Sequence, residues 1–243
     1  MTFQELLKTF KVQPDISRKI WDENDQLKPE VRNALLRVAK LFYDSIELED
    51  KPPIKDIVLT GSMAGYNYTD SSDIDLHLLF DFESLGDKKE LFEKIFLLAK
   101  ARWNDNHNIL VKGHDVEVYA EDEKSPHVTT GLYSVQDDKW LKKAEKETPV
   151  FDELDVKTKV RYFVNMYNEM KRDFKAGKIE GLKDRVEALR QKIKQFRQSG
   201  LEKGGIFSVE NITFKALRRI GMLGKLADLN TDLVDKDLSV ENR

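Results

Sequence analysis

Two aspartates, Asp73 and Asp75, stand two residues apart at the start of an apolar run that ends at Phe80. Residues two apart in a β-strand project from one face, so both carboxylates are expected side by side, with Ile74 and Leu76 turned into a core. Adjacent carboxylates repel each other unless a cation lies between them, and Mg²⁺ prefers oxygen ligands. The pair therefore predicts metal-dependent chemistry.

A glycine-serine turn precedes this pair. Gly61 and Ser62 follow the apolar stretch 54–60, and Ser62 lies eleven residues before Asp73. Backbone N–H groups at a turn of this kind can hold phosphate oxygens. A phosphate-binding turn beside two carboxylates indicates metal-dependent transfer from a nucleoside triphosphate.

A second acidic pair occurs in the alternating stretch 113–119. Val116 and Val118 are expected to face one way, and Asp115 and Glu117 the other. If this strand is a neighbour of the first, the carboxylates converge on one patch of a sheet, which is stable only with cations. Three or four carboxylates, Asp115 and Glu117 among them, would then share this patch.

Other polar residues near the pair allow two interpretations each. His77 continues the face of Asp75, so it either lines the same cleft or is a partly buried histidine bonded to a carboxylate. Tyr66, in the loop before the aspartates, could contact a base, although tyrosines are also common in turns. Three histidines lack the spacing of a metal-binding pair and are interpreted as ordinary polar residues: His107, His114 and His127.

Composition excludes several classes of protein. The 243 residues include no Cys, which excludes disulfides and thiolate-zinc sites and favours a cytoplasmic protein. No apolar run is long enough for a membrane span, and the first residues lack a secretion signal, so no membrane partner is expected.

Charge is unevenly distributed. Residues 157–225 contain 18 Lys and Arg against 7 Asp and Glu, a net charge of +11, which leaves −14 for the rest of a chain of net charge −3. This excess favours binding of RNA or DNA by the basic segment. Alternatively, the basic segment complements the acidic part of the chain and a triphosphate.

The spacing of apolar residues predicts the elements that position these groups. An amphipathic helix begins at Pro29, and strands are expected at 54–60, 73–80, 113–119 and near 128–135. A helix over 87–106 is expected to bury Leu91, Ile95, Leu98 and Trp103. After Pro149 the chain reads as helical, with a flexible joint at 200–205 and a last helix from an N-cap at Ser208 to about Leu226.

The predicted fold class is α/β (α+β), with a small mixed β-sheet and flanking helices, followed by an α-helical C-terminal domain. The expected boundaries are an N-terminal helical strap at 1–26, a catalytic domain at 27–135, a basic helical domain at 150–228 and a flexible acidic tail at 229–243.

The order of these motifs resembles the signature of the nucleotidyltransferase superfamily named after DNA polymerase β. Gly61 and Ser62 match its turn, and the Asp-Ile-Asp strand matches its aspartate pair. Glu117 is the best match to its third acidic residue, with Asp115 as the runner-up. The resemblance covers residues 54–119.

The resemblance implies an enzyme that moves a nucleoside monophosphate from an NTP to an acceptor hydroxyl and releases pyrophosphate. Its catalytic and metal-binding residues would be Asp73, Asp75 and Glu117, which would hold two Mg²⁺ ions that Mn²⁺ could replace. The donor nucleotide would contact a further set of residues: Gly61, Ser62, Tyr66 and His77.

The acceptor stays open at this point. An RNA end such as the 3′ end of tRNA, another nucleotide (as in a synthase of oligonucleotide second messengers), and a protein or small molecule are all compatible with the motifs. Residues 102–107, 131–134 and 207–211 also resemble uncharacterised nucleotidyltransferase-like proteins of large tailed bacteriophages, which would act in the host cytoplasm. The alternative outside the enzymes is a catalytically silent nucleotide-binding scaffold.

Overall fold

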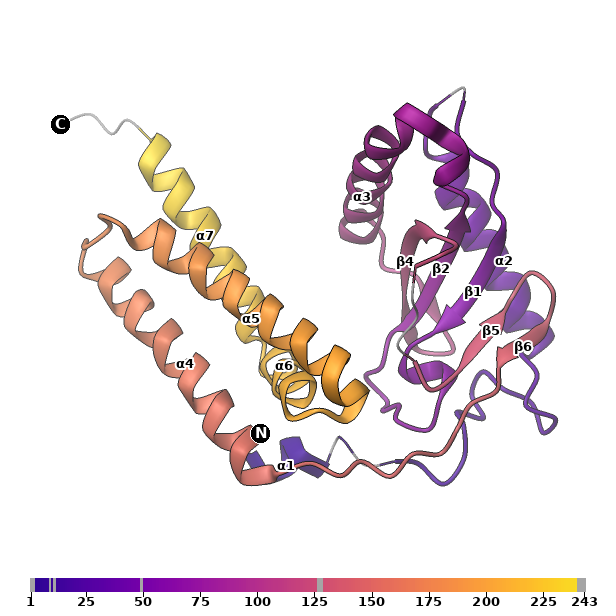
Figure 1. Ribbon diagram of the computed structural model, residues 1–243, viewed down its shortest axis with the longest axis horizontal. Helices are drawn as coiled ribbons and strands as arrows, with labels where there is room; N and C mark the ends of the chain where they lie inside the picture. The colour runs from indigo at the N-terminus through magenta and orange to yellow at the C-terminus, as the bar shows by residue number, and fades with distance from the viewer. Residues whose placement is uncertain (1–2, 9, 11, 49, 126–128, 240–243) are drawn as a thin grey trace. The chain divides into compact units, whose positions relative to one another are not determined.

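A six-stranded mixed sheet forms the centre of the first part of the chain (Figure 1), with the strand order β3-β4-β2-β1-β5-β6. Neighbouring strands are antiparallel except β2 and β4, which are parallel. The strands are β1 (Asp56–Thr60), β2 (Ile74–Phe80), β3 (Leu110–Val111), β4 (His114–Asp122), β5 (Leu132–Ser134) and β6 (Lys139–Lys142). The computed structural model describes residues 3–8, 10, 12–48, 50–125 and 129–239.

Contacts divide the chain into two units. The α/β unit comprises Val12–Thr148, and the helical unit comprises Met1–Lys11 with Pro149–Arg243. The predicted combination of a mixed sheet, flanking helices and a C-terminal helical region is confirmed.

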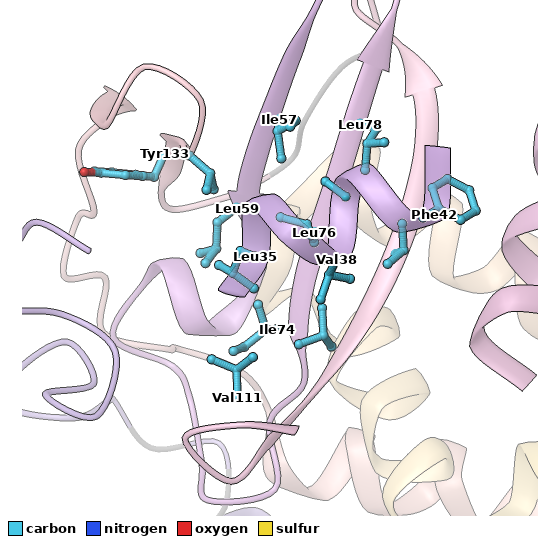
Figure 2. Close-up of a cluster of buried hydrophobic side chains, with 14 of the residues drawn as sticks. Leu35, Val38, Phe42, Ile57, Leu59, Ile74, Leu76, Leu78, Val111 and Tyr133 are labelled. Carbon is cyan, nitrogen blue, oxygen red and sulfur yellow. The ribbon is translucent and has the colours of Figure 1, made fainter. Parts of the chain in front are cut away.

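Two long helices accompany the sheet, α2 (Pro29–Asp44) and α3 (Lys89–Asn106), together with the short 3-10 helices η1 (Ser62–Ala64) and η2 (Glu83–Lys88). Parallel strands need a crossover connection, and α3 provides it between β2 and β4. Side chains of α2, among them Leu35 and Phe42, pack on Ile74, Leu76 and Leu78 of β2 (Figure 2). One face of β2 is therefore fully occupied by the core.

The buried stripe of α3 differs from the prediction. Leu91 and Leu98 were expected inside but are 56% and 69% exposed, whereas Phe92 and Phe96 are buried together with Trp103. Aromatic rings offer more apolar area than leucines, so the helix turns their stripe toward the sheet. In α2, Leu41 is likewise exposed, whereas Val38 and Phe42 are buried.

Strand boundaries shift by a few residues. The structure begins β2 at Ile74, which leaves Asp73 in the loop before it, and extends β4 to Asp122. The strand expected near 128–135 is shorter, at Leu132–Ser134, and its first residue lies outside the described residues, as does His127. The strands β3 and β6 had no clear sequence signal, because each is short.

The helical unit contains α1 (Phe3–Lys8), α4 (Glu153–Lys175), α5 (Leu182–Gly204), η3 (Gly205–Phe207), α6 (Val209–Arg219) and α7 (Met222–Leu238). The Ser208 side chain accepts a hydrogen bond from the Asn211 N–H, which confirms the predicted N-cap. The helix that it begins ends at Arg219 instead of near Leu226, because Gly221 adopts a left-handed conformation with φ of 70°.

Two further expectations in this unit are corrected. Most of the expected flexible joint at 200–205 belongs to α5, which ends at Gly204. Part of the expected flexible tail continues α7 to Leu238, because Leu229 and Leu233 extend its buried stripe; residues 240–243 lie outside the described residues. In the parts of the chain that the structure describes, no helix has the length and apolarity to cross a bilayer.

Candidate active site

Asp75 of β2 and Glu117 of β4 are partners in the parallel pairing of these strands. Their neighbours Ile74, Leu76 and Val118 are fully buried in the core. Because side chains alternate along a strand, Asp75 and Glu117 lie next to each other on the opposite face. The two acidic strands, whose neighbour relationship the sequence left open, are therefore paired.

The glycine-serine turn lies directly against this carboxylate pair. Thr60, the last residue of β1, pairs with Asp75, and Gly61 follows with φ of 74°. A Cβ atom at Gly61 would lie 1.9 Å from Asp75 Oδ2, far inside van der Waals contact. Only glycine therefore fits here, both for its left-handed conformation and for its contact with the carboxylate.

The residues after Gly61 are held firmly. Ser62 begins η1, and its carbonyl accepts the Gly65 N–H. The Trp21 indole N–H donates a 2.9 Å hydrogen bond to the Met63 carbonyl, and Trp21 itself is fully buried and stacked on Trp140. The turn is thus anchored to the core of the α/β unit, as a preorganised phosphate site requires.

The loop that carries Asp73 is tied to β4. His114 is only 2% exposed, and its Nδ1 lies 2.8 Å from the Ser72 carbonyl oxygen. His114 is therefore a buried contact of this loop instead of the ordinary polar residue that its spacing indicated. Asp73 and Asp115 each stand one residue before the first β2–β4 pair, Ile74 with Val116.

His77 lies on the same face as Asp75 and is nearly buried. Its Nδ1 is 3.1 Å from Glu121 Oε2, and its ring stacks on Tyr119 with a centroid distance of 4.5 Å. His77 thus lies at ion-pair distance from a carboxylate and on the face of Asp75, which is compatible with both interpretations. A role of His77 in nucleotide binding stays a prediction.

The face of the sheet that carries Asp75 and Glu117, here called the acidic face, includes two contacts that sequence reasoning missed, Tyr119 and Lys100. The Tyr119 hydroxyl donates a 2.6 Å hydrogen bond to Glu117 Oε2, and Lys100 of α3 places its Nζ 3.7 Å from the centre of the Tyr119 ring. Burial lowers the pKa of Lys100, while the nearby charges of Glu117, Glu121 and Asp75 act in the opposite direction. Tyr119 could have been found from its alternation with Glu117, and Lys100 from its helical spacing to Phe96 and Asn104.

Tyr66 belongs to a loop that is fastened by the segment before it. Its carbonyl accepts a 2.6 Å hydrogen bond from the Gln13 N–H, and the Gln13 side chain donates to the Tyr68 carbonyl. Lys146 Nζ lies 5.7 Å from the Tyr66 ring centre. A contact of Tyr66 with a nucleotide base stays a prediction.

Metal ligands are not gathered in this arrangement. Within the described ranges, no three His, Asp or Glu side chains come close enough together to hold one metal ion. Asp75 and Glu117 are strand neighbours, whereas Asp73 precedes β2.

No protein-family model and no curated protein matches the chain. Among solved structures, one match is a protein of Sulfolobus solfataricus assigned provisionally as a nucleotidyltransferase, with 19% identity over 46% of this chain and 90% of that one and a TM-score of 0.28. Another is the cyclic dinucleotide synthase CdnE of Elizabethkingia meningoseptica with GTP and Apcpp, with 12% identity over 97% of this chain and 83% of that one and a TM-score of 0.29.

Proposed function

We propose that this chain is a nucleotidyltransferase that moves a nucleoside monophosphate from an NTP to an acceptor hydroxyl. The observation that carries the proposal is the contact between the Gly61 backbone and Asp75 Oδ2. Asp75 is in turn the partner of Glu117 in the pairing of β2 with β4. The turn, which is able to bind phosphate, and the two carboxylates therefore lie next to each other. Triphosphate chemistry needs both in proximity.

The donor triphosphate lies on the turn. The backbone N–H and hydroxyl of Ser62 contact the β- or γ-phosphate, and the missing side chain of Gly61 lets the phosphate approach the backbone. Trp21 supports this by fixing Met63, so that the turn does not have to reorganise when the donor binds.

The acidic residues fit Mg²⁺ in type, since all are carboxylates and Mg²⁺ is bound by oxygen. The three carboxylates do not surround one point by themselves within the described residues, but Mg²⁺ usually takes only one or two carboxylates together with substrate phosphates and water. Asp73, Asp75 and Glu117 would therefore hold two such ions, or Mn²⁺ in their place, together with the donor triphosphate. Bound metal would supply charge neutralisation at the triphosphate and a lower pKa of the acceptor hydroxyl. Asp115 is the alternative third ligand, but Glu117 is favoured because it is the strand partner of Asp75.

The transfer is a single displacement. The acceptor oxygen forms a bond to the α-phosphorus, the bond from this phosphorus to the bridging oxygen breaks, and pyrophosphate leaves with the electron pair. The proton of the acceptor hydroxyl passes to the Glu117 carboxylate. Tyr119 holds that carboxylate in orientation through its hydrogen bond to Oε2.

The distribution of charge favours one of the acceptor classes. The net charge of +11 in residues 157–225 supports an RNA acceptor, with the 3′ end of tRNA as one example. Synthesis of oligonucleotide second messengers and modification of a protein or small molecule are the alternatives.

Labelling tests the proposal directly. The protein is incubated with each α-labelled NTP, Mg²⁺ or Mn²⁺ and total RNA, and we expect label in an RNA species together with released pyrophosphate. Asp75→Asn should abolish release while circular dichroism shows an unchanged fold, because Asp75 contacts the turn and is a proposed metal ligand. Unchanged turnover in Asp75→Asn would contradict the assignment.

A thermal-shift panel separates the enzyme from a silent scaffold. Stabilisation by NTP that requires Mg²⁺ supports the enzyme, because only a ligand that prefers the folded state raises the midpoint. Stabilisation by NTP to the same extent with and without Mg²⁺, combined with no labelled product, would support the scaffold.

A further inference from the structure

Lys100 reaches the acidic face from the crossover helix α3. Four residues later, Asn104 fixes α3 to the edge of β4 through two 3.0 Å hydrogen bonds, from its side-chain amide to the Val118 carbonyl and from the Val118 N–H to its side-chain oxygen. Residues four apart lie on the same side of a helix. Lys100 is therefore directed at β4 by the same packing.

The ammonium group of Lys100 is held by an aromatic ring. Its Nζ lies 3.7 Å from the centre of the Tyr119 ring, within the range of a strong cation–π contact. His77 stacks on the same ring at 4.5 Å with an angle of 13°. Two groups so close to one ring cannot share a face, so the ring lies between His77 and Lys100.

Lys100 keeps hydrogen-bonding capacity. In the described part of the chain, no carboxylate lies at ion-pair distance from its Nζ, although Glu117, Glu121 and Asp75 act on it electrostatically. Lys100 is only half-buried, so part of the residue is accessible from solvent. An ammonium has three N–H donors and no acceptor, which suits a phosphate oxygen.

The position of Lys100 separates it from the donor site. In the sheet, β2 lies between β1 and β4. The Gly61 turn follows β1 and touches Asp75, whereas Lys100 lies against Tyr119 of β4, beyond Glu117. The proposed triphosphate site is thus on the β1 side of the carboxylates, and the lysine is on the β4 side, against the tyrosine that is bonded to Glu117.

We propose that Lys100 binds a phosphate of the acceptor, so that the acceptor is a nucleotide, either free or at the end of a strand. This inference rests on the proposed function and narrows its acceptor. The acceptor hydroxyl loses its proton to Glu117 and bonds to the α-phosphorus as pyrophosphate leaves, while Lys100 stays protonated and makes no covalent bond. A neutral hydroxyl compound would offer the N–H donors of this ammonium no anionic oxygen.

Acceptor kinetics test the proposal. The wild type, Lys100→Met and Lys100→Arg are compared with four ribonucleosides, their 5′-monophosphates and a mixed-sequence oligoribonucleotide with a free 3′-hydroxyl. The donor-only rate is subtracted, because an NTP also carries phosphates. The matched control is Lys94→Met, which removes an exposed lysine from the same helix.

The expected result is a change confined to the acceptor. Lys100→Met should raise the acceptor KM for the phosphate-bearing compounds roughly tenfold or more, because a charged hydrogen bond is lost. The donor KM should not change, Lys100→Arg should restore most of the loss, and Lys94→Met should match the wild type. Preference for monophosphates or for the oligonucleotide identifies the source of the phosphate.

Binding without turnover separates this inference from the proposed function. Equilibrium dialysis with labelled AMP and adenosine should show tighter binding of AMP by the wild type, and loss of that preference in Lys100→Met. Equal use of ribonucleosides and monophosphates, or an unchanged acceptor KM in Lys100→Met, would overturn the inference and leave the proposed function standing. No transfer by the wild type to any acceptor would overturn the proposed function, and the dialysis would then decide on the phosphate site alone.

Discussion

Tyr119 donates a 2.6 Å hydrogen bond to Glu117 from two residues further along the same strand. The bond joins the proposed proton acceptor to a ring that also contacts His77 and Lys100. A carboxylate on an open sheet face would otherwise choose among several rotamers. The tyrosine therefore fixes the direction in which Glu117 points.

Tyr119→Phe tests this orientation. The variant keeps the ring contacts and removes only the hydroxyl, so the free energy of unfolding should fall by no more than about 1 kcal/mol. We expect kcat for pyrophosphate release to fall by roughly tenfold, in line with about 1.4 kcal/mol of lost orientation, while the donor KM stays the same. Lys94→Met again serves as the control. An unchanged kcat would show that Glu117 does not need the tyrosine.

Gly61→Ala tests the contact between the turn and the carboxylate. The new Cβ would lie 1.9 Å from Asp75 Oδ2, so the turn or the carboxylate has to move, and transfer should be lost. The control is Gly113→Ala, because Gly113 also has a positive φ, of 83°, but has nothing within 4 Å of its Cβ position. Both variants incur backbone strain of roughly 1–2 kcal/mol, measured by urea unfolding, but only Gly61→Ala should lose activity. Equal activities would argue against the turn as a phosphate site.

The sequence predicted the acidic face of β2 and β4 well, but it predicted the elements packed around that face poorly. Period-two alternation correctly separated Asp75 from Ile74 and Glu117 from Val118, because one buried face imposes that pattern on a strand. It could not show that β2 and β4 are neighbours in register, since pairing joins residues 42 positions apart, as in Asp75 and Glu117. The metal ligands, the donor and the acceptor stay predictions.

The helix α3 shows why the rest was missed. Leucines at 91 and 98 fitted a helical stripe as well as Phe92 and Phe96 did, and only packing against the sheet decides between two stripes one residue apart. The wrong stripe also concealed Lys100, which lies four residues after Phe96 and so on the buried side. A charged residue on the buried side of a helix is the signal that could have identified it.

Asn104→Ala tests the attachment of α3. Both of its hydrogen bonds to the Val118 backbone would be lost, and the edge of β4 would be left with unsatisfied groups there. The free energy of unfolding of the chain should fall by about 1–3 kcal/mol, as measured by urea titration. Asn106→Ala removes an exposed asparagine near the end of the same helix and should change stability little. Equal loss in both variants would mean that the strand contact is not the cause, and helix propensity cannot account for a loss because Ala favours the helix more than Asn does.

Nucleic-acid binding by the helical unit is tested by salt dependence. Lys183 and Lys194 are exposed lysines of α5 that take part in no ion pair within the described residues, so their charge is available to phosphates. We expect the double variant Lys183→Glu, Lys194→Glu to bind a single-stranded oligoribonucleotide more weakly in filter binding. The slope of log K against log salt should become less steep by roughly 0.7 for each phosphate that the protein no longer neutralises.

Lys94→Glu, which changes an exposed lysine of α3, is the control and should leave the slope unchanged. If the wild type fails to bind RNA even at low salt, the basic helices serve the triphosphate or the fold, and the acceptor must be a free nucleotide, another small molecule or a protein.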